Sequence, residues 1–289
     1  MLNKSFFLLS KILNSSPLFH LSMDDNFDTI EKKNFLTGKE LRFALLALSF
    51  GTIKFYLITF SIVPSPFKWK GISFFQHINF DLVQNRKTPG FLKAQMDEYE
   101  SSTLKNIDAE TREKQEEFLK LRIAENNESL SNIFNKVNYH TTIILAYAAV
   151  LVYTYTKLIE LQITTATIFI YYLAIINLLD IFDLIFLLKK TVSISGFVRS
   201  TFKQLRSCNE KYSLTKSLYF DWAASTNDVQ YFAGLAKNSE IISIKIIFIG
   251  IIILAGTTLL PEQIKNTRQE TSVFLQSIAF NDHTTKENL

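Results

Sequence analysis

Two apolar stretches that follow each other almost directly decide the fold of this chain: TTIILAYAAVLVYTYTKL (residues 141–158) and ITTATIFIYYLAIINLLDIFDLIFLL (residues 163–188). A third stretch, IISIKIIFIGIIILAGTTLL, covers residues 241–260. Each is close to the ~17–25 residues that a helix needs to cross a hydrocarbon core. Because irregular backbone cannot face lipid, the sequence predicts a transmembrane hairpin followed by a third transmembrane helix.

The composition fits a membrane protein that also has a large part outside lipid. Of 289 residues 47% are hydrophobic, and the three stretches use only a small share of the chain. Glycine (8) and proline (5) are scarce, which disfavours the broken helices of many transporters. Cys208 is the only cysteine, so no intrachain disulfide can form and the chain suits a reducing compartment. The net charge of +4 suits a protein beside an anionic leaflet and does not indicate nucleic-acid binding.

Sequence motifs of enzymes are missing from the chain. It has no glycine-rich phosphate loop, no H-E-x-x-H, no G-x-S-x-G and no cysteine–histidine metal spacing. We therefore expect a protein that is not an enzyme and that holds no metal or other cofactor.

Residues 1–19, MLNKSFFLLSKILNSSPLF, combine basic residues with a short apolar stretch at residues 6–9. That stretch is shorter than the ~7–15 residues of a signal-peptide core, and no small-x-small cleavage site follows. The segment is therefore either a short amphipathic leader or an unstructured terminus.

A fourth apolar stretch, residues 43–63, includes Lys54. Its second half, TIKFYLITFSIV, is rich in β-branched and aromatic residues, which fits either a buried strand or a mixed core segment. Lys and Arg concentrate in residues 189–240, so the positive-inside rule places that segment in the cytosol and the tail outside. A span at residues 43–63 would then put the basic N-terminus outside. We favour three spans over four, with residues 43–63 in the cytosolic part or at the interface.

Residues 106–140 read as one long helix without glycine or proline. Its apolar seam has the spacing of a coiled coil and continues in phase into the first span, so one helix should rise from the cytosol into the membrane. The partner of the seam is either another part of this chain or a second copy. The polar member of the seam, Asn126, either sets register and oligomer state or is an ordinary surface residue. The seam consists of Leu119, Ile123, Asn126, Leu130, Ile133 and Val137.

The predicted fold is mainly α, a multi-pass membrane protein with a cytosolic helical stalk preceded by a small α or α+β part. Residues 203–238 read as a helix that returns beside the stalk. The expected divisions are an N-terminal cytosolic or interfacial region (1–105), the stalk (106–140), the transmembrane hairpin (141–188), a basic helical return (189–240), the third transmembrane helix (241–260) and the C-terminal tail (261–289).

Polar residues inside the spans are the first candidates for function. Asn177, Asp180 and Asp183 are spaced three apart and share a helix face. Carboxylates at membrane depth are costly and usually face a bundle interior or water. The stripe therefore lines a pore or forms a latch, or it makes structural contacts between helices. Lys245, one turn into the third span, either snorkels to the cytoplasmic interface or pairs with Asp183; snorkelling is the simpler expectation.

Two basic clusters could contact anions, either a nucleotide messenger or lipid head groups. Lipid is the simpler expectation for the first cluster. The second lies near Trp69 and is the first choice for a ligand contact if residues 1–105 hold a sensor. The first cluster is Lys203, Arg206, Lys211 and Lys216, and the second is Lys68, Lys70, Arg86 and Lys87.

The layout of the apolar stretches and several positions around the hairpin carry a family resemblance. These positions are Arg122, Asn126, Leu130, Ile133, Lys136 and Asn138 before the hairpin, and Tyr219, Trp222, Lys237 and Asn238 before the third apolar stretch. Over residues 106–260 this layout resembles the membrane module of bacterial antiphage transmembrane effectors, namely the Pycsar transmembrane effector and the SLATT-domain group. The resemblance implies a membrane effector that responds to an infection signal and damages the inner membrane.

The leading hypothesis is therefore a homo-oligomeric, inner-membrane effector that permeabilises or depolarises the membrane in antiphage defence. Its partners would be the lipid bilayer and either a nucleotide second messenger or a cytosolic protein. The alternative is a membrane anchor or scaffold that recruits a cytosolic partner. A channel or transporter subunit is the third hypothesis, disfavoured by the low glycine and proline content and the lack of repeats.

Overall fold

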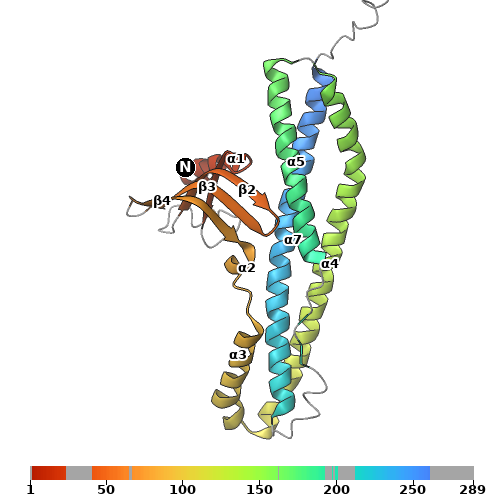
Figure 1. Ribbon diagram of the computed structural model, residues 1–289. Helices are drawn as coiled ribbons and strands as arrows, with labels where there is room; N and C mark the ends of the chain where they lie inside the picture. Colours follow the sequence, from red (N-terminus) through yellow and green to blue (C-terminus); the bar gives the residue numbers. More distant parts are fainter. Residues whose placement is uncertain are drawn as a thin grey trace, which may run out of the picture.

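The computed structural model describes residues 2–23, 41–64, 67–161, 163–192, 197, 199–200 and 212–260. Three long helices form a tall bundle, and a small sheet lies beside it (Figure 1). All three helices are long and apolar enough to cross a membrane, which confirms the three predicted spans. They are α4 (Ala109–Ile159), α5 (Thr165–Val192) and α7 (Ser213–Leu259).

The helices α4 and α7 each combine a polar and an apolar half without interruption. The predicted continuous helix is confirmed, since α4 runs unbroken from Ala109 to Ile159. At 1.5 Å per residue its 51 residues extend ~75 Å, far more than a bilayer core needs. The predicted return helix is present from Ser213 onwards and continues directly into the third span. Residues 203–211 of that prediction lie outside the described residues.

The turn between α4 and α5 is closed by threonines. Thr164 Oγ1 accepts a hydrogen bond from the backbone N–H of Thr167 at 3.2 Å, and Thr167 Oγ1 donates to the Thr164 carbonyl at 2.8 Å. A side chain that caps free N–H groups stabilises a helix start. The chain therefore reverses within a few residues, and α5 descends beside α4 and α7 (Figure 1).

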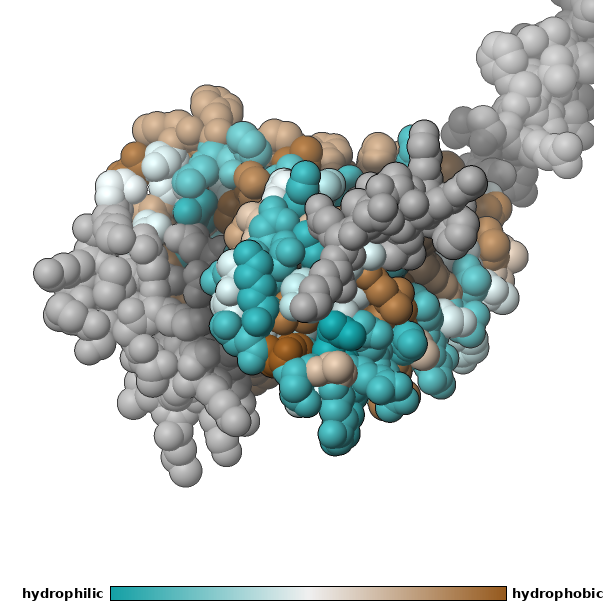
Figure 2. All heavy atoms as spheres, turned by 90° about the horizontal axis from the view of Figure 1, so that it is seen from below, coloured by the Kyte–Doolittle hydropathy of each residue, from teal (hydrophilic) through white to brown (hydrophobic). Residues whose placement is uncertain are grey.

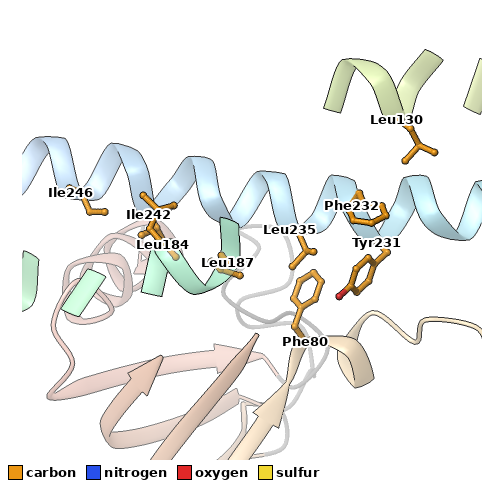
Figure 3. Close-up of a cluster of buried hydrophobic side chains, with 9 residues drawn as sticks. All are labelled: Phe80, Leu130, Leu184, Leu187, Tyr231, Phe232, Leu235, Ile242 and Ile246. Carbon is orange, nitrogen blue, oxygen red and sulfur yellow. The ribbon is translucent and has the colours of Figure 1, made fainter. Parts of the chain in front are cut away.

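The seam of the stalk packs against α7 of the same chain. Leu130 of α4 lies in one cluster with Tyr231, Phe232 and Leu235 of α7 (Figure 3). Leu119 and Val137 are buried as well. Of the two partners left open by the sequence, the intramolecular one is present. The cluster joins both spanning and non-spanning segments: Phe80, Leu130, Leu184, Leu187, Tyr231, Phe232, Leu235, Ile242 and Ile246.

The N-terminal region contains a four-stranded antiparallel sheet in the order β1-β2-β3-β4. Residues 43–63 belong to a β2–β3 hairpin, so of the two alternatives for their second half the strand is present, and the four-span alternative is wrong. The β-branched and aromatic residues of this stretch satisfy their backbone groups by pairing with neighbouring strands. The strands are β1 (Phe19–Met23), β2 (Leu41–Phe50), β3 (Ile53–Pro64) and β4 (Phe67–Asn79).

Short helices flank the sheet and tie it to the bundle. Residues 2–13 form helix α1, so the leader is helical, and its Phe7 packs on Leu21 and Leu41 of the sheet. After β4 the chain descends along the lower half of α7, where Tyr99 stacks on Tyr219 with ring centroids 4.1 Å apart. The helices are α1 (Leu2–Leu13), α2 (Phe80–Val83), α3 (Pro89–Ser102) and the single turn η1 (Leu104–Asn106).

Candidate functional site

A charged pair lies inside the bundle at membrane depth. Counting 1.5 Å per residue, Asp180 is ~22 Å below the start of α5 at Thr165, and Lys245 is ~21 Å below the end of α7 at Leu259. A hydrocarbon core is ~30 Å thick, so both residues lie within it when the upper helix ends mark its boundary. The two helices therefore place one acid and one base at the same depth.

Lys245 forms an ion pair with Asp180. Its Nζ lies 2.8 Å from Asp180 Oδ1, and the two side chains are 27% and 15% exposed. The acid that pairs with Lys245 is thus Asp180 and not Asp183, the partner considered from the sequence. Among the three residues of the α5 stripe, Asp180 is the one that faces α7. At this depth a neighbouring opposite charge stabilises the ammonium group of Lys245 more than partial contact with water would.

Asp183 binds the sheet. Its Oδ1 accepts the backbone N–H of Gly51, in the turn between β2 and β3, at 2.5 Å. Gly51 has φ of +61°, and a Cβ added there would lie 2.7 Å from Cβ of Phe186. Only glycine fits this left-handed turn pressed against α5. The sequence analysis did not single out Gly51, although a glycine between two strand-like stretches was a visible turn signal.

His20 and Lys54 extend the polar cluster into the sheet, outside the three spanning helices. Both side chains are buried. Burial lowers the pKa of Lys54 to about 7, against the opposing pull of the Asp183 carboxylate. Burial, together with the ammonium groups of Lys54 and Lys245, holds the pKa of His20 well below its usual value. His20 and Lys54 of the sheet are thus close to the carboxylates of Asp180 and Asp183 on α5. The sequence analysis had mentioned Lys54 but not His20.

Asn177 completes the predicted stripe. It is fully buried one turn above Asp180, and within the described part of the chain neither polar atom of its amide has a hydrogen-bond partner. Buried amides normally have at least one such partner. Asn177, Asp180 and Asp183 all face the interior, as their spacing predicted. In this conformation they are packed among side chains of α7 and the sheet.

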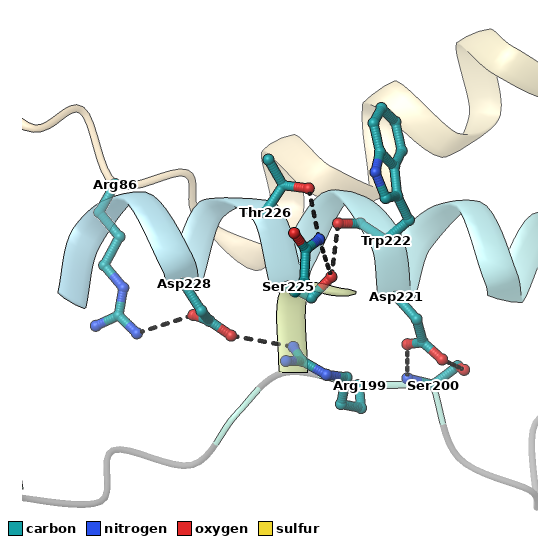
Figure 4. Close-up of polar contacts among 9 residues, drawn as sticks. Arg86, Arg199, Ser200, Asp221, Trp222, Ser225, Thr226 and Asp228 are labelled. Carbon is teal, nitrogen blue, oxygen red and sulfur yellow. Dashed lines mark hydrogen bonds and ion pairs between the residues drawn. The ribbon is translucent and has the colours of Figure 1, made fainter. Parts of the chain in front are cut away.

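A second polar group joins the two long helices outside the spans (Figure 4). Asn126 of α4 donates through Nδ2 to Ser225 Oγ at 2.9 Å and to Thr226 Oγ1 at 3.0 Å. Asn126 is therefore a polar member of the seam that bonds α7 of its own chain. Nearby on α7, Asp228 pairs with Arg199 at 3.0 Å and with Arg86 at 3.5 Å.

Replacing Asn126 with alanine should lower the free energy of unfolding by about 1–2 kcal/mol, because the hydroxyls of Ser225 and Thr226 lose a partner. Asn127→Ala is the matched control, since Asn127 is exposed on the same helix turn. Thermal unfolding in detergent measures both variants. Equal melting temperatures would show that Asn126 does not fix the pairing of α4 and α7.

The first basic cluster is described only at Lys216. There the Nζ atom lies 2.7 Å from Glu100, and the side chain is 14% exposed. Lys216 therefore has an acidic partner within its own chain, and this ion pair holds α3 against α7. Lys203, Arg206 and Lys211 lie outside the described residues.

The second basic cluster is not a single patch. Lys68 and Lys70 are at the start of β4, whereas Arg86 and Lys87 follow its end, and nine residues of strand extend ~30 Å. Arg86 lies over the ring of Tyr231 at 4.4 Å, and Lys87 donates to Gln95 at 3.2 Å. The sequence analysis grouped these four residues without allowing for the extended strand that separates the two pairs.

Fold and site together define a class: a helical multi-pass membrane protein with a charged pair between two spanning helices and a sheet bound to one of them. Comparisons with family models, curated proteins and solved structures gave no match for this chain.

Proposed function

We propose that this protein is a non-enzymatic effector of the bacterial inner membrane that depolarises it in antiphage defence. The observation that carries the proposal is the Asp180–Lys245 pair, buried between α5 and α7 at membrane depth. Ionisable residues at such a depth are expensive and usually belong to an ion or substrate pathway. The resemblance of residues 106–260 to antiphage transmembrane effectors supports the same function.

The pair works as a latch in this proposal. While Lys245 neutralises Asp180 and Gly51 binds Asp183, the polar stripe stays packed and no ions pass. Separation of α5 from α7, in an assembly of several copies, turns Asn177, Asp180 and Asp183 towards a shared path. The trigger is a nucleotide messenger or a cytosolic protein. It acts on the N-terminal sheet, whose Gly51 binds Asp183 of α5.

The orientation has the stalk in the cytosol and the C-terminal tail outside, because Lys and Arg concentrate between the second and third spans. Figure 2 views the lower end of the bundle, where hydrophilic side chains predominate. This polar surface supports a position of the lower bundle end in the cytosol, where the partners that trigger the effector would be.

Asp180→Leu combined with Asp183→Leu should abolish depolarisation while membrane expression is kept. The two leucines remove the acidic side chains that attract cations to the path. A voltage-sensitive dye in bacteria induced to express the chain measures the effect. The control is Glu113→Leu with Glu117→Leu, an acidic pair at exposed positions of the stalk, which should leave depolarisation intact. Unchanged depolarisation in the first variant would contradict a role of the acidic stripe in the ion path.

A second function, that of a membrane anchor for a cytosolic partner, is supported by Phe118 and Leu121. They are 53% and 57% exposed on the polar half of α4. An anchor leaves the membrane potential unchanged at full expression and loses its partner when both residues become serine. Depolarisation by the unaltered chain therefore excludes a simple anchor and supports the effector.

A further inference from the structure

The N-terminal region exposes an unusual amount of apolar surface. Leu8, Leu9 and Ile12 lie along one face of α1 and are 51–61% exposed. On β4, the side chains of Ile72, Phe74 and Phe75 are 64–78% exposed. A soluble domain rarely leaves large apolar side chains grouped in this way, and such groups mark a contact surface.

Several polar side chains of the same region are buried, beside the apolar Leu41, Ala44 and Tyr56. Ser22, Thr59 and Lys54 are each less than 5% exposed, and Arg42 is 9% exposed. The sheet therefore buries several polar side chains while Ile72, Phe74 and Phe75 stay exposed. A domain in water usually exposes its polar side chains and covers its large apolar ones, so this surface fits an apolar environment.

Two contacts fix the height of the region along the bundle. Near the end of α1, Ser16 Oγ and Tyr172 Oη are 2.6 Å apart, and Tyr172 is ~11 Å below the start of α5. The Gly51–Asp183 bond lies ~16 Å further down. Both contacts fall on the apolar stretch of α5. Figure 1 shows α1 and the sheet beside this helix, rather than below it.

The exposed apolar surface lies at the same height along the bundle as the lipid-facing surface of α5. Ile175, Phe182 and Ile185 are 52–62% exposed along this spanning helix. Acyl chains around these side chains also reach α1 and β4, since both lie at the same level. The chemistry of the occupant is therefore that of lipid tails.

We propose that the exposed face of α1 and the exposed apolar side chains of β4 lie in the leaflet on the stalk side, with acyl chains covering Leu8, Leu9, Ile12, Ile72, Phe74 and Phe75. The N-terminal region is then a lipid-facing part of the membrane body, although it contributes no span. This inference rests on the depth of α5 and holds whether or not the protein depolarises membranes.

The test places a fluorescent label on single cysteines in the full chain. In a Cys208→Ser background, Leu9→Cys and Phe74→Cys are labelled with an environment-sensitive dye and reconstituted in vesicles of phosphatidylethanolamine and phosphatidylglycerol. Nitroxide-labelled lipids quench dyes near acyl chains, and aqueous iodide quenches dyes in water. Phe182→Cys is the control for lipid and Glu117→Cys, exposed on the stalk, is the control for water.

The expected result is a loss of fluorescence at Leu9 and Phe74 with nitroxide lipid similar to that at Phe182, and little loss with iodide. Iodide quenching similar to that at Glu117 would overturn the proposal, because the surface would then face water. Quenching by neither reagent would also overturn it, since a second copy or another protein would then cover the surface. Two positions on separate elements guard against a local effect of one label.

Discussion

Replacing Lys245 with methionine should destabilise the protein by about 3–5 kcal/mol, the usual cost of leaving a buried charge without its partner. The carboxylate of Asp180 is 15% exposed and Lys245 is the cation that neutralises it. Methionine keeps the length of the side chain, so the loss of charge dominates. Unfolding of the purified protein in detergent, by heat or by denaturant, gives the free energy.

A matched control and a rescue separate the charge from the rest of the substitution. Lys237→Met changes the same residue type on the same helix at an exposed position and should cost about 0–1 kcal/mol. Asp180→Leu combined with Lys245→Met should recover most of the stability, because an apolar pair replaces the ionic one. Equal losses for the two lysines, or no recovery in the double variant, would show that the pair does not hold α5 to α7.

Gly51→Val should cost about 3 kcal/mol and release the sheet from α5. A side chain at this position adds backbone strain at φ +61° to a collision with Cβ of Phe186. The turn would move away, and Asp183 would lose the Gly51 N–H. Thermal unfolding gives the cost, and limited proteolysis of the sheet reports its release.

The control for this substitution is Gly71→Val, since a Cβ at Gly71 meets no atom within 4 Å. It should leave both the melting temperature and the protease pattern nearly unchanged. If the sheet is also part of the proposed latch, Gly51→Val should depolarise cells without any trigger, and Gly71→Val should not. A Gly51→Val protein that melts and cleaves like the unaltered chain would contradict the close contact of the turn with α5.

Features that depend on neighbours in the sequence were predicted well. The continuous helix from Ala109 to Ile159 follows from an unbroken supply of helix-forming residues, because each helical hydrogen bond links residues four apart. The inward face of Asn177, Asp180 and Asp183 follows from their spacing of three. The strand within residues 52–63 was visible in its β-branched residues.

Features that depend on distant contacts were missed or wrong. The contact of Gly51 with Asp183 joins residues 132 positions apart, and no local pattern announces it. The same holds for the choice of Asp180 over Asp183 as partner of Lys245, because the packing of α5 against α7 decides which carboxylate meets the ammonium group. Lys216 looked like a free basic residue until α3 placed Glu100 beside it.

By itself the sequence determined the number of spanning helices, their polar continuation and the depth of the polar stripe, since length, hydropathy and helical period are local quantities. Only the tertiary structure decided which charges meet, and that an N-terminal sheet lies beside α5 with several polar side chains buried, Lys54 among them. The physical reason is that a charge or a backbone group at low dielectric must find its partner in space, and the three-dimensional packing alone selects that partner.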